Sequence, residues 1–488
     1  MTTIARLRDA LTAADYSYAG VSALLGPTAH AALGRNETTP GLRATRGGTP
    51  LETLVRLWLL QTPVPLDKAE QALPGLVDEL CAEGILERSV AEVAARVDLR
   101  PYGADDRDFW VFGDLTPGLD GGPSTVGPDH VLGISPAATS LAELTVRDRA
   151  GSALDLGTGC GVQSLHLAGH VGHVVATDVN TRALWMTRLN AELNGLELDV
   201  REGSFFEPVR GERFDLVVTN PPFVISPATG QRLVYRDSGL PGDEVVEHIV
   251  RTVPAHLNPG GTAQILANWA IRSGEPWQER LARWFPASGV DAWVVQREVL
   301  DTAAYVELWL KDAGLHGAGD YRERYDTWLS WFDEQRIEAV GFGWLNLRRH
   351  HQGGDATSSG VRLEEWRWEV EQPLGREIGA HFDRVARLRD LDDQALLASR
   401  PRLALDVVQE TLGPAGAEDP SQIVLRRQTG MRRARQVDTV TSALAGAADG
   451  DLTLGQLLSA IGELLGEVDV PSRLGEVREL VGEGFLDV

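Results

Sequence analysis

The chain has 488 residues, of which 43% are hydrophobic and 24% are charged, and its formal net charge is −24. This length allows roughly two to four domains, and the composition is that of a globular protein. The acidic balance argues against nonspecific coating of nucleic acid, because an acidic surface repels phosphate at long range. Cys81 and Cys160 are too few for a disulfide framework and lack the spacing of metal ligands, so the sequence predicts no metal site.

The start of the chain and its hydropathy bear on where the protein works. Residues 1–18 lack the apolar core of a signal peptide. No stretch reaches the roughly twenty apolar residues that a membrane span needs. We therefore expect a cytoplasmic protein. The sequence shows no repeat of fixed period and predicts no particular oligomeric state.

Residues 1–128 are predicted to form an N-terminal domain in which short helices precede short strands. The apolar spacing predicts helices at residues 51–59, 66–68 and 73–83. Strands are expected at residues 85–86, 94–99 and 109–112, with a turn at residues 101–103. Helices followed by a β-hairpin are typical of a winged helix, a module that binds nucleic acid or protein or packs against a neighbouring domain. The Pro- and Gly-rich stretch at residues 116–128 predicts a linker.

Residues 129–352 repeat the order strand, Gly-rich turn and helix. Strands are expected at residues 152–156, 173–178, 197–201, 214–219, 261–268, 291–297 and 337–347. Such alternation predicts an α/β fold, a Rossmann-like parallel sheet with helices on both faces.

Residues 353–488 are predicted to form a C-terminal, mainly helical domain that resembles a winged helix or a helix-turn-helix. Helices are expected at residues 378–388, 394–403, 452–465 and 474–481. A basic run at residues 426–435 contains five arginines and no acid. These arginines either grip the phosphates of a nucleic acid or pair with carboxylates of the chain itself, and the sequence favours neither.

A glycine-rich turn follows the first strand of the central domain. Residues 153–161 have the sequence Ala-Leu-Asp-Leu-Gly-Thr-Gly-Cys-Gly and lead into a helix at residues 162–167. Glycines let such a turn tighten and let a ligand approach the backbone. The next strand ends at Asp178, where an acid would meet ribose hydroxyls. The acid alone also fits a dehydrogenase, but the spacing Asp-x-Gly-x-Gly-x-Gly differs from the Gly-x-Gly-x-x-Gly of dinucleotide-binding proteins.

The second motif is Asn220-Pro221-Pro222-Phe223, directly after the strand expected at residues 214–219. In open α/β sheets, ligands bind beyond the carboxyl ends of the strands. Two prolines stiffen the backbone there. We expect this rigidity to aim the Asn220 side-chain oxygen and the Pro221 carbonyl oxygen at one point.

A planar NH2 group fits that arrangement. Its nitrogen is a poor nucleophile because its lone pair is delocalised, and two acceptors on its hydrogens would stabilise the positive charge that develops when it attacks. Positioning supplies much of the remaining acceleration, so neither a metal nor a strong base is required. The Phe223 ring is flat and is predicted to stack on the group that reacts.

The two motifs, in this order and spacing, resemble class I methyltransferases that modify exocyclic or amide nitrogens, over residues 129–350. The group includes release-factor glutamine, N6-adenine and ribosomal RNA guanine-N2 methyltransferases. The resemblance implies a seven-stranded sheet whose last two strands form an antiparallel pair, with S-adenosylmethionine as cofactor. It implies that the tetrapeptide Asn220, Pro221, Pro222 and Phe223 is catalytic. It implies cofactor binding by Asp155, Gly157, Thr158, Gly159, Gly161, Asp178, Ser204, Phe205 and Asn220.

Two departures from the glutamine enzymes favour a nucleic-acid base as acceptor. Those enzymes usually carry an acid where Ser204 stands, and a Pro-Arg-x-Glu-Thr-like segment where this chain has Ser135-Pro136-Ala137-Ala138-Thr139. Phe223 is similar to the ribosomal RNA enzymes, since the glutamine enzymes more often have tyrosine. The whole architecture, with extra domains at both ends, resembles an uncharacterised actinobacterial-type methyltransferase group.

Three functions remain open at this point. The first is methylation of a nucleic-acid base, in ribosomal or transfer RNA or, less favoured, in DNA. The second is methylation of a glutamine in a translation factor, for which an acidic surface suits a basic partner protein. The third is a non-catalytic scaffold that binds the cofactor.

Two segments near the expected site have alternative interpretations. Residues 225–243, which include Tyr235-Arg236-Asp237, form either a loop that helps to select the substrate or a simple connection. Residues 348–351, Arg-Arg-His-His, either line the substrate entrance or are a solvated strand end.

Overall fold

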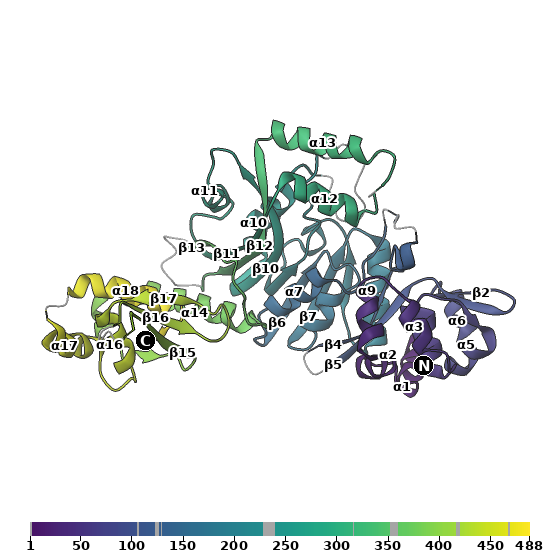
Figure 1. The fold of residues 1–488 in the computed structure, drawn as a ribbon, viewed down its shortest axis with the longest axis horizontal. Coiled ribbons are helices and arrows are strands. Elements are labelled where there is room, and N and C mark those ends of the chain that lie inside the picture. Colours follow the sequence, from purple (N-terminus) through teal and green to yellow (C-terminus); the bar gives the residue numbers. More distant parts are fainter. Residues whose placement is uncertain are drawn as a thin grey trace.

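Two smaller domains flank a large twisted sheet in the computed structural model of the chain (Figure 1). The structure describes residues 2–104, 107–122, 126–127, 129–227, 240–315, 317–351, 360–415, 420–466 and 469–488. Among the helices of these residues, none combines the length and the apolar character that crossing a membrane requires.

The N-terminal domain is built from short helices and a small sheet. Its helices are α1 (Thr3–Ala13), α2 (Tyr18–Leu33), α3 (Thr39–Ala44), α4 (Pro50–Leu54), the π-helix η1 (Val55–Leu59), α5 (Leu66–Ala72) and α6 (Val77–Ala82). Its sheet has the order β1 (Val64–Pro65), β3 (Glu92–Ala95) and β2 (Leu86–Arg88). The helices α4 to α6 precede the β2–β3 hairpin, and a winged helix at this position is still a prediction.

A two-stranded ribbon, β4 (Asp98–Ala104) and β5 (Arg107–Gly113), links this domain to the central sheet. The turn predicted at residues 101–103 is wrong, because these residues lie inside β4. Pro101 stands opposite Trp110, and both strands of a ribbon are edges, where proline is tolerated. Part of the predicted linker is fixed to the N-terminal domain, because the Asp120 side chain accepts a hydrogen bond from the Thr38 backbone at 2.7 Å.

The central sheet has eight strands in the order β13-β11-β12-β10-β9-β6-β7-β8. The strands are β6 (Ala150–Leu156), β7 (Val171–Asp178), β8 (Asp199–Glu202), β9 (Phe214–Thr219), β10 (Leu257–Arg272), β11 (Val290–Asp301), β12 (Ile337–Arg349) and β13 (Val361–Glu365). Only β12 runs against its neighbours, pairing antiparallel with β10 and β11. The predicted Rossmann-like α/β fold is confirmed, with all seven expected strands present and the last two paired antiparallel.

The eighth strand, β13, lies beyond the boundary predicted at residue 352 and belongs to the sheet. It pairs parallel with β11, from Val361 opposite Ala292 to Glu365 opposite Gln296. The strand covers the edge that β11 would otherwise expose, which is a common way to protect a sheet. Its sequence, Val-Arg-Leu-Glu-Glu, is short and charged, so its pattern alone gave no signal.

Helices cover both faces of the sheet. They are α7 (Pro136–Leu144), α8 (Val162–Leu167), α9 (Thr181–Leu193), α10 (Glu244–Thr252) and α11 (Trp277–Ala282), with the short 3-10 helices η3 (Glu207–Val209) and η5 (Val253–His256). On one face, α7 packs on an apolar core that includes Leu216, Val218, Leu266, Trp293 and Val295. We call this the α7 face. On the other, α10 and α11 pack on a second core.

A pair of helices, α12 (Thr302–Asp312) and α13 (Tyr321–Glu334), is inserted between β11 and β12. The insertion stands above the edge at which the parallel strands end (Figure 1). It has its own apolar core, in which Tyr305, Trp309, Trp328 and Phe332 pack against Val224 and Ile225. The insertion therefore touches the segment that follows the tetrapeptide.

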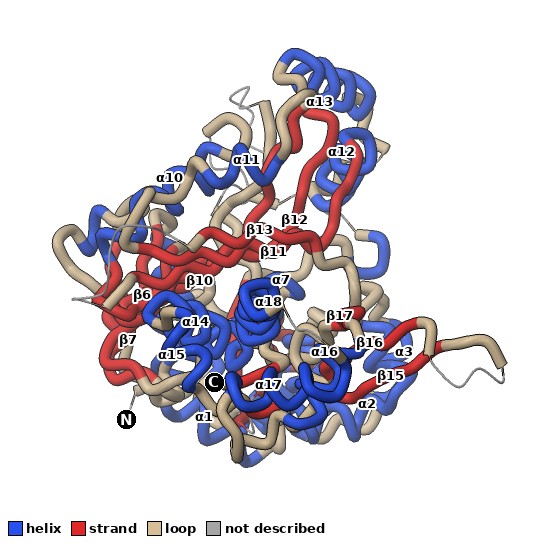
Figure 2. The backbone as a smooth tube through the Cα atoms, turned by 90° about the vertical axis from the view of Figure 1, so that its left-hand side faces the viewer, coloured by secondary structure: helices blue, strands red, loops and turns tan. Residues whose placement is uncertain are grey.

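The C-terminal domain has its own core and lies at the opposite end of the molecule from the N-terminal domain (Figure 1), and it faces the viewer in Figure 2. Its helices are α14 (Gly375–Asp390), α15 (Asp393–Ala398), α16 (Thr439–Ala447), α17 (Leu454–Leu465) and α18 (Val470–Gly482). Its strands are β14 (Arg402–Leu403), β15 (Val407–Leu412), β16 (Gln422–Arg427), β17 (Ala434–Val437) and β18 (Leu486–Asp487). The helix predicted at residues 394–403 ends at Ala398, before Pro401, and β14 follows.

The two end domains share a ten-residue sequence pattern. Residues 77–86 and 477–486 both have the pattern Val-x-Glu-Leu-x-x-Glu-Gly-x-Leu. In each, a helix ends at a glycine with positive φ, 77° at Gly84 and 83° at Gly484. The next N–H then donates to a leucine carbonyl in the helix, at 3.0 Å for Ile85 and 2.8 Å for Phe485. The same local code therefore builds the same helix-to-strand turn twice.

Candidate active site

The predicted cofactor loop connects β6 to α8 at the carboxyl edge of the sheet. Its glycines have φ angles of 71° at Gly157, 57° at Gly159 and 86° at Gly161, which favour glycine over other residues. A Cβ atom at Gly157 or Gly159 would meet no atom of the described residues within 4 Å. This side of the loop is therefore open to a ligand.

Asp155 stabilises the conformation of this loop through hydrogen bonds in the protein interior. The side chain is 1% exposed, and its Oδ2 atom accepts hydrogen bonds from Thr158 Oγ1 at 2.7 Å, Ser164 N at 3.0 Å and Ser164 Oγ at 2.7 Å. Burial raises the pKa of Asp155 to about 6. Because Asp155 and Thr158 are both buried, the structure places them beneath the loop as its support, and the glycines form its open surface.

Asp178 lies at the end of β7, beside the glycine loop. Its Oδ2 accepts a hydrogen bond from Gly159 N at 3.0 Å, and its Oδ1 accepts one from Asn180 N at 2.9 Å. Burial raises the pKa of this carboxyl. A carboxylate oxygen accepts more than one hydrogen bond, so both oxygens keep capacity for a hydroxyl donor. The structure thus brings the predicted acid to the predicted loop.

Ser204 and Phe205 follow β8 and line a pocket of about 600 Å³ together with Leu240, Glu244 and His248. Phe205 has a positive φ of 47°, which is uncommon for a bulky residue. Its ring meets the His248 ring edge to face at a centroid distance of 4.8 Å. The pocket is therefore walled by an aromatic pair and suits a flat group.

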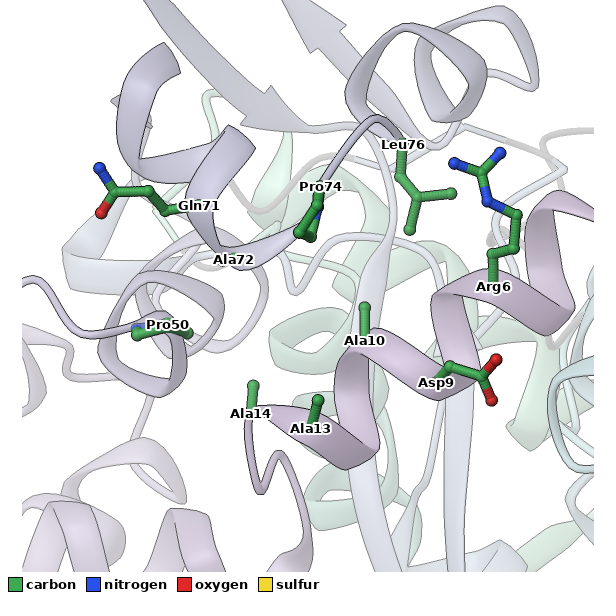
Figure 3. Close-up of a pocket in the computed structure, with 10 residues that line it drawn as sticks. All are labelled: Arg6, Asp9, Ala10, Ala13, Ala14, Pro50, Gln71, Ala72, Pro74 and Leu76. Carbon is green, nitrogen blue, oxygen red and sulfur yellow. The ribbon is translucent and has the colours of Figure 1, made fainter.

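A second pocket, of about 330 Å³, lies in the N-terminal domain between α1 and the α5–α6 segment (Figure 3). Its walls are mainly alanine and proline side chains, with Arg6, Asp9 and Gln71 as the polar members. None of the predicted site residues lies in this pocket. Arg6, the basic residue of this pocket, donates to Glu79 at 2.6 Å.

Asn220 follows the last residue of β9, and its Oδ1 atom is buried without a hydrogen-bond partner among the described residues. Leaving a buried acceptor unmet costs free energy, so such atoms are rare and mark places where a ligand can bind. The strand end is tied to the cofactor strand, because Thr219 Oγ1 donates to the Leu156 carbonyl at 2.7 Å. The acceptor and the glycine loop therefore share one edge.

Tyr305 on α12 holds the segment after the tetrapeptide, and sequence reasoning missed it. The buried hydroxyl accepts a hydrogen bond from Ile225 N at 2.9 Å and another from Asn268 Nδ2 at 3.2 Å. Burial raises the pKa of Tyr305 well above its usual range. Phe223 packs against the same helix, with its ring 6.5 Å from Trp309.

Asp243 and Arg280 form a second anchor for the same segment. The guanidinium donates to both carboxylate oxygens, at 2.5 and 2.7 Å, and both side chains are buried. Asp243 also accepts a hydrogen bond from Ala270 N at 2.8 Å. Both ends of the predicted loop at 225–243 are thus fixed, while residues 228–239, including Tyr235-Arg236-Asp237, lie outside the described residues.

Two asparagines in the C-terminal part of α9, Asn190 and the C-cap residue Asn194, join the N-terminal domain to the central domain. Asn190 Nδ2 donates to the carbonyls of Cys160, at 2.7 Å, and Phe112, at 3.0 Å, and Asn190 Oδ1 accepts from Phe112 N at 2.7 Å. Asn194 makes a similar pair with the backbone of Trp110 on β5. Since Cys160 belongs to the glycine loop, the ribbon of the N-terminal domain supports that loop directly.

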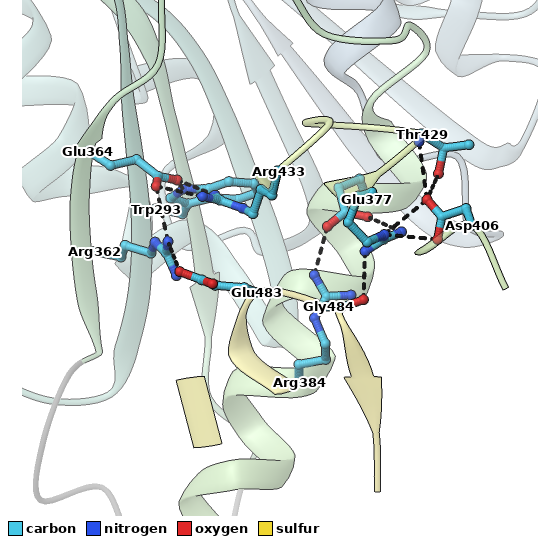
Figure 4. Close-up of polar contacts among 11 residues, drawn as sticks. Trp293, Arg362, Glu364, Glu377, Arg384, Asp406, Thr429, Arg433, Glu483 and Gly484 are labelled. Atoms are coloured by element: carbon cyan, nitrogen blue, oxygen red, sulfur yellow. Dashed lines mark hydrogen bonds and ion pairs between the residues drawn. The ribbon is translucent and has the colours of Figure 1, made fainter. Parts of the chain in front are cut away.

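The basic run at 426–435 pairs with the chain's own carboxylates and does not form an open phosphate grip. The partners are Glu410 for Arg426, Asp406 for Arg427, Glu369 for Arg432, Glu364 for Arg433 and Glu483 for Arg435. Figure 4 shows the contacts of Arg433 with Glu364 and of Asp406 with Thr429. Most of the run therefore pairs within the C-terminal domain, and Arg433 joins this domain to β13 of the sheet.

Residues 348–351 do not line the site entrance. β12 runs antiparallel to β10, and Arg348 lies opposite Thr262 near the start of β10. This places the end of β12 at the amino edge of the sheet, away from Asn220. Arg348 donates to Asp383 at 2.5 Å. Among the described residues, no group of three His, Cys, Asp or Glu side chains is arranged to hold a metal ion.

Comparison with known proteins assigns the central region. Residues 134–285 match the family model of the methyltransferase small domain. The central region is therefore similar to methyltransferase small domains, and we call it the methyltransferase domain below. Residues 13–96 match a domain of unknown function, DUF7059.

Curated relatives share this methyltransferase domain. The chain is 37% identical over 128 residues to a release factor glutamine methyltransferase of Xylella fastidiosa, covering 24% of this chain and 46% of the relative. It is 32% identical over 118 residues to a ribosomal RNA small subunit methyltransferase C of Alcanivorax borkumensis, covering 24% of this chain and 32% of the relative. The chain thus spans less than half the length of these relatives.

Solved structures also resemble the methyltransferase domain. A 16S rRNA methyltransferase of Thermus thermophilus, determined with AdoMet and guanosine, aligns with a TM-score of 0.27 and 19% identity, covering 47% of this chain and 60% of that one. A [4+2]-cyclase aligns with a TM-score of 0.29 and 16% identity, covering 44% and 80%.

Proposed function

We propose that the chain transfers a methyl group from S-adenosylmethionine to a planar NH2 group at the carboxyl edge of the sheet. The buried Oδ1 atom of Asn220, without a partner among the described residues, carries this proposal. It lies one residue beyond a strand that is tied to the start of the glycine loop. S-adenosylmethionine supplies a methyl group on a sulfonium, which is already a good leaving group.

The residues around the glycine loop fit this cofactor. Gly157 and Gly159 present an open backbone surface, and Asp178 has free acceptor capacity for ribose hydroxyls. Ser204 and Phe205 border a pocket walled by aromatic rings, which suits adenine. Asp155 and Thr158 act from below the loop, where they keep its shape.

Asn220 and the Pro221 carbonyl would receive the two hydrogens of the NH2 group. Two acceptors fixed before the reaction stabilise the positive charge on nitrogen without having to reorganise. Pro221 and Pro222 stiffen this backbone. Tyr305, through Ile225, keeps the tetrapeptide from shifting.

We propose an exocyclic amine of an RNA base as the acceptor. The relatives named ribosomal RNA small subunit methyltransferase C support this choice, as do Ser204 and Phe223 in place of the acid and tyrosine of the glutamine enzymes. A glutamine in a translation factor is the second candidate. The net charge of −24 favours it, since an acidic chain attracts a basic protein, and a relative is named release factor glutamine methyltransferase.

The acceptor class is tested by incubating the protein and radiolabelled S-adenosylmethionine with extract from cells that lack the enzyme. We expect the label to be released by ribonuclease. Label released only by protease would establish the second candidate, and absence of any label would favour a non-catalytic scaffold.

Two substitutions test the site, because one should lower the rate of transfer and the other should weaken cofactor binding. Asn220→Ala should lower the rate of transfer about 100-fold or more while cofactor affinity stays the same, because the acceptor acts on charge that develops in the reaction. Asp178→Ala should weaken cofactor binding instead, which calorimetry measures. Asn258→Ala, at the amino edge, is the matched control, since its amide bonds to Asp215. Equal turnover by Asn220→Ala and the parent would contradict the mechanism.

A further inference from the structure

Two tryptophans, Trp344 and Trp366, lie on the α7 face at the same edge as Asn220, and an exposed third, Trp368, contacts Trp366. Trp344, on β12, stands opposite Leu266 of β10, and Leu266 is one residue beyond the partner of Thr219. A Cβ atom at Gly343 would lie 2.7 Å from the Trp269 ring. Trp269 belongs to the core on the other face. Because side chains alternate along a strand, Trp344 points to the α7 face.

Trp366 and Trp368 follow β13 and continue this surface. Trp366 N donates to the Gln296 carbonyl at 2.8 Å, which places it at the end of the sheet ladder. Trp344, Trp366 and Phe223 all pack against the apolar core of the α7 face. The Trp366 and Trp368 rings meet edge to face at 5.1 Å. We call Trp344, Trp366 and Trp368 the tryptophan shelf.

Arg297 fixes the shelf in place. Its guanidinium lies over the Trp344 ring, 5.1 Å from the centroid. The same group donates to the Trp366 carbonyl at 2.5 Å and to the Trp368 carbonyl at 2.8 Å. Arg297 thus joins the backbone of Trp366 and Trp368 to the ring face of Trp344. Arg433 lies over the Trp366 ring at 4.7 Å.

Trp368 is unusual because its backbone is fixed while its side chain is 67% exposed. Burying a tryptophan releases a large apolar area from water, so an exposed one held in position marks a binding surface. Aromatic rings with a neighbouring arginine are the platform on which nucleic-acid bases stack, since every base has a flat π face.

The charges around the shelf permit a polyanion, although the chain as a whole is acidic. Glu364 pairs with Arg433, Glu365 with Arg367 and Glu369 with Arg432. Arg297 donates to carbonyl oxygens, so its charge is not offset by a carboxylate among the described residues. The three pairs cancel in charge, so the shelf region is close to neutral within a chain whose net charge is −24.

The distance from the shelf to Asn220 suits nucleotides that flank a target base. Neighbouring strands are about 4.8 Å apart, so Trp344 is about 10 Å and the end of β13 about 20 Å from β9. Nucleotides advance about 3.4 Å each along a stacked strand. We propose that the tryptophan shelf stacks bases of a single-stranded RNA segment a few nucleotides from the base that is methylated. This rests on the proposed function with RNA as acceptor.

Binding of the full-length protein to a fluorescein-labelled, single-stranded RNA of about twelve nucleotides tests the shelf by fluorescence anisotropy. Stacking on an aromatic ring is worth about 1–3 kcal/mol per base, so Trp368→Ala should raise the Kd about 5- to 100-fold. Trp368→Tyr should restore most of the affinity, because a phenol ring still stacks. Tyr18→Ala removes an exposed aromatic ring from the N-terminal domain and should change the Kd less than twofold.

The outcomes separate the shelf from the proposed function. Equal Kd values for Trp368→Ala and the parent, or no binding of the RNA by the parent, would overturn the shelf as an RNA surface. The same holds if the parent binds a basic peptide in place of the RNA and Trp368→Ala loses that binding. If Asn220→Ala binds RNA like the parent and Trp368→Ala does not, the shelf stands, whatever the acceptor assay shows. Unchanged melting of Trp368→Ala confirms that the fold is intact.

Discussion

The two end domains use the same turn but join the methyltransferase domain in different ways. Both carry the pattern Val-x-Glu-Leu-x-x-Glu-Gly-x-Leu. The N-terminal domain shares one continuous apolar core with α8 and α9, which includes Val162, Leu165 and Met186. The C-terminal domain has a separate core. It meets the sheet through Ile378 and Phe382 of α14 and through Met431, which lie in the core of the α7 face, and through arginine–carboxylate pairs that we call the charged joint. A shared apolar core makes two domains fold together, whereas pairs of charged residues mainly fix the position of one domain relative to the other.

This difference separates the tasks of the two domains. The N-terminal domain supports the glycine loop through Asn190 of α9, which donates to the Phe112 carbonyl of the ribbon and to the Cys160 carbonyl of the loop. The C-terminal domain contacts β11 and β13, near the tryptophan shelf, through Arg433. We expect loss of the first domain to affect cofactor binding and loss of the second to affect the acceptor side.

The largest expected effect comes from removing each domain in turn. A chain that begins at residue 129 should fail to fold stably, because it exposes the apolar surface of α8 and α9 that the N-terminal domain buries. A chain that ends at residue 391 should keep cofactor binding, because α14 remains to cover its part of the sheet. Soluble yield and calorimetry with the cofactor measure this. Equal behaviour of the two truncations would contradict the comparison.

A single side chain should reproduce part of that effect. Asn190→Ala leaves Phe112 N and two buried carbonyls without partners, and should lower the free energy of unfolding by about 3 kcal/mol. It should also weaken cofactor affinity, because the Cys160 carbonyl belongs to the loop. Asn194→Ala, one turn further along α9 and less buried, is the matched control and should cost less. Chemical denaturation and calorimetry measure the two quantities.

The charged joint should respond to pH, whereas the shared core should not. Burial raises the pKa of Glu364, but the hydrogen bonds from Arg433 and Trp293 and the charges of Arg433 and Arg362 together outweigh burial and hold the pKa at about 2, against an ordinary 4.5. A lowered pKa means that the stabilising contribution is complete above about pH 4.5 and is lost as the pH falls towards 2. It amounts to about 3 kcal/mol. Limited proteolysis between pH 6 and pH 3 should release the C-terminal domain first, and Glu364→Gln should remove the dependence.

The smallest effect is expected at the exposed end of the same joint. Arg432 lies 3.7 Å from Glu369, whose side chain is 93% exposed. Pairs of this kind contribute about 0–1 kcal/mol. Arg432→Ala should therefore leave the melting temperature within about 2 °C of the parent. A large loss would show that the joint depends on the surface pairs and not on Arg433.

Local patterns gave the fold of the methyltransferase domain and the outline of its site. The strand expected at 214–219 is β9 to the residue, because a short apolar run bounded by charge and by Asn-Pro-Pro leaves little freedom. The glycine loop and Asp178 meet as predicted, since both follow the carboxyl ends of adjacent parallel strands. Which of the predicted residues contact the cofactor is still a prediction.

Contacts between distant residues were the part that the sequence could not provide. Tyr305 reaches Ile225 across eighty positions of the chain, and neither residue has an unusual local context. β13 carries two glutamates in five residues, and its identity as a strand comes from pairing with β11. The arginines at 426–435 looked available for phosphate because their partners, such as Glu364, lie far away in the sequence.

The insertion between β11 and β12 restricts how this protein can diverge. Connections between edge strands usually change length freely, and new substrate preferences often arise there. In this chain the first helix of that connection also holds the backbone after Asn220-Pro221-Pro222-Phe223, through the Tyr305 hydroxyl. A change in α12 would therefore shift the backbone at residues 220–223 as well as change the substrate preference. The lineage should therefore have kept the first helix constant and placed its variation in α13.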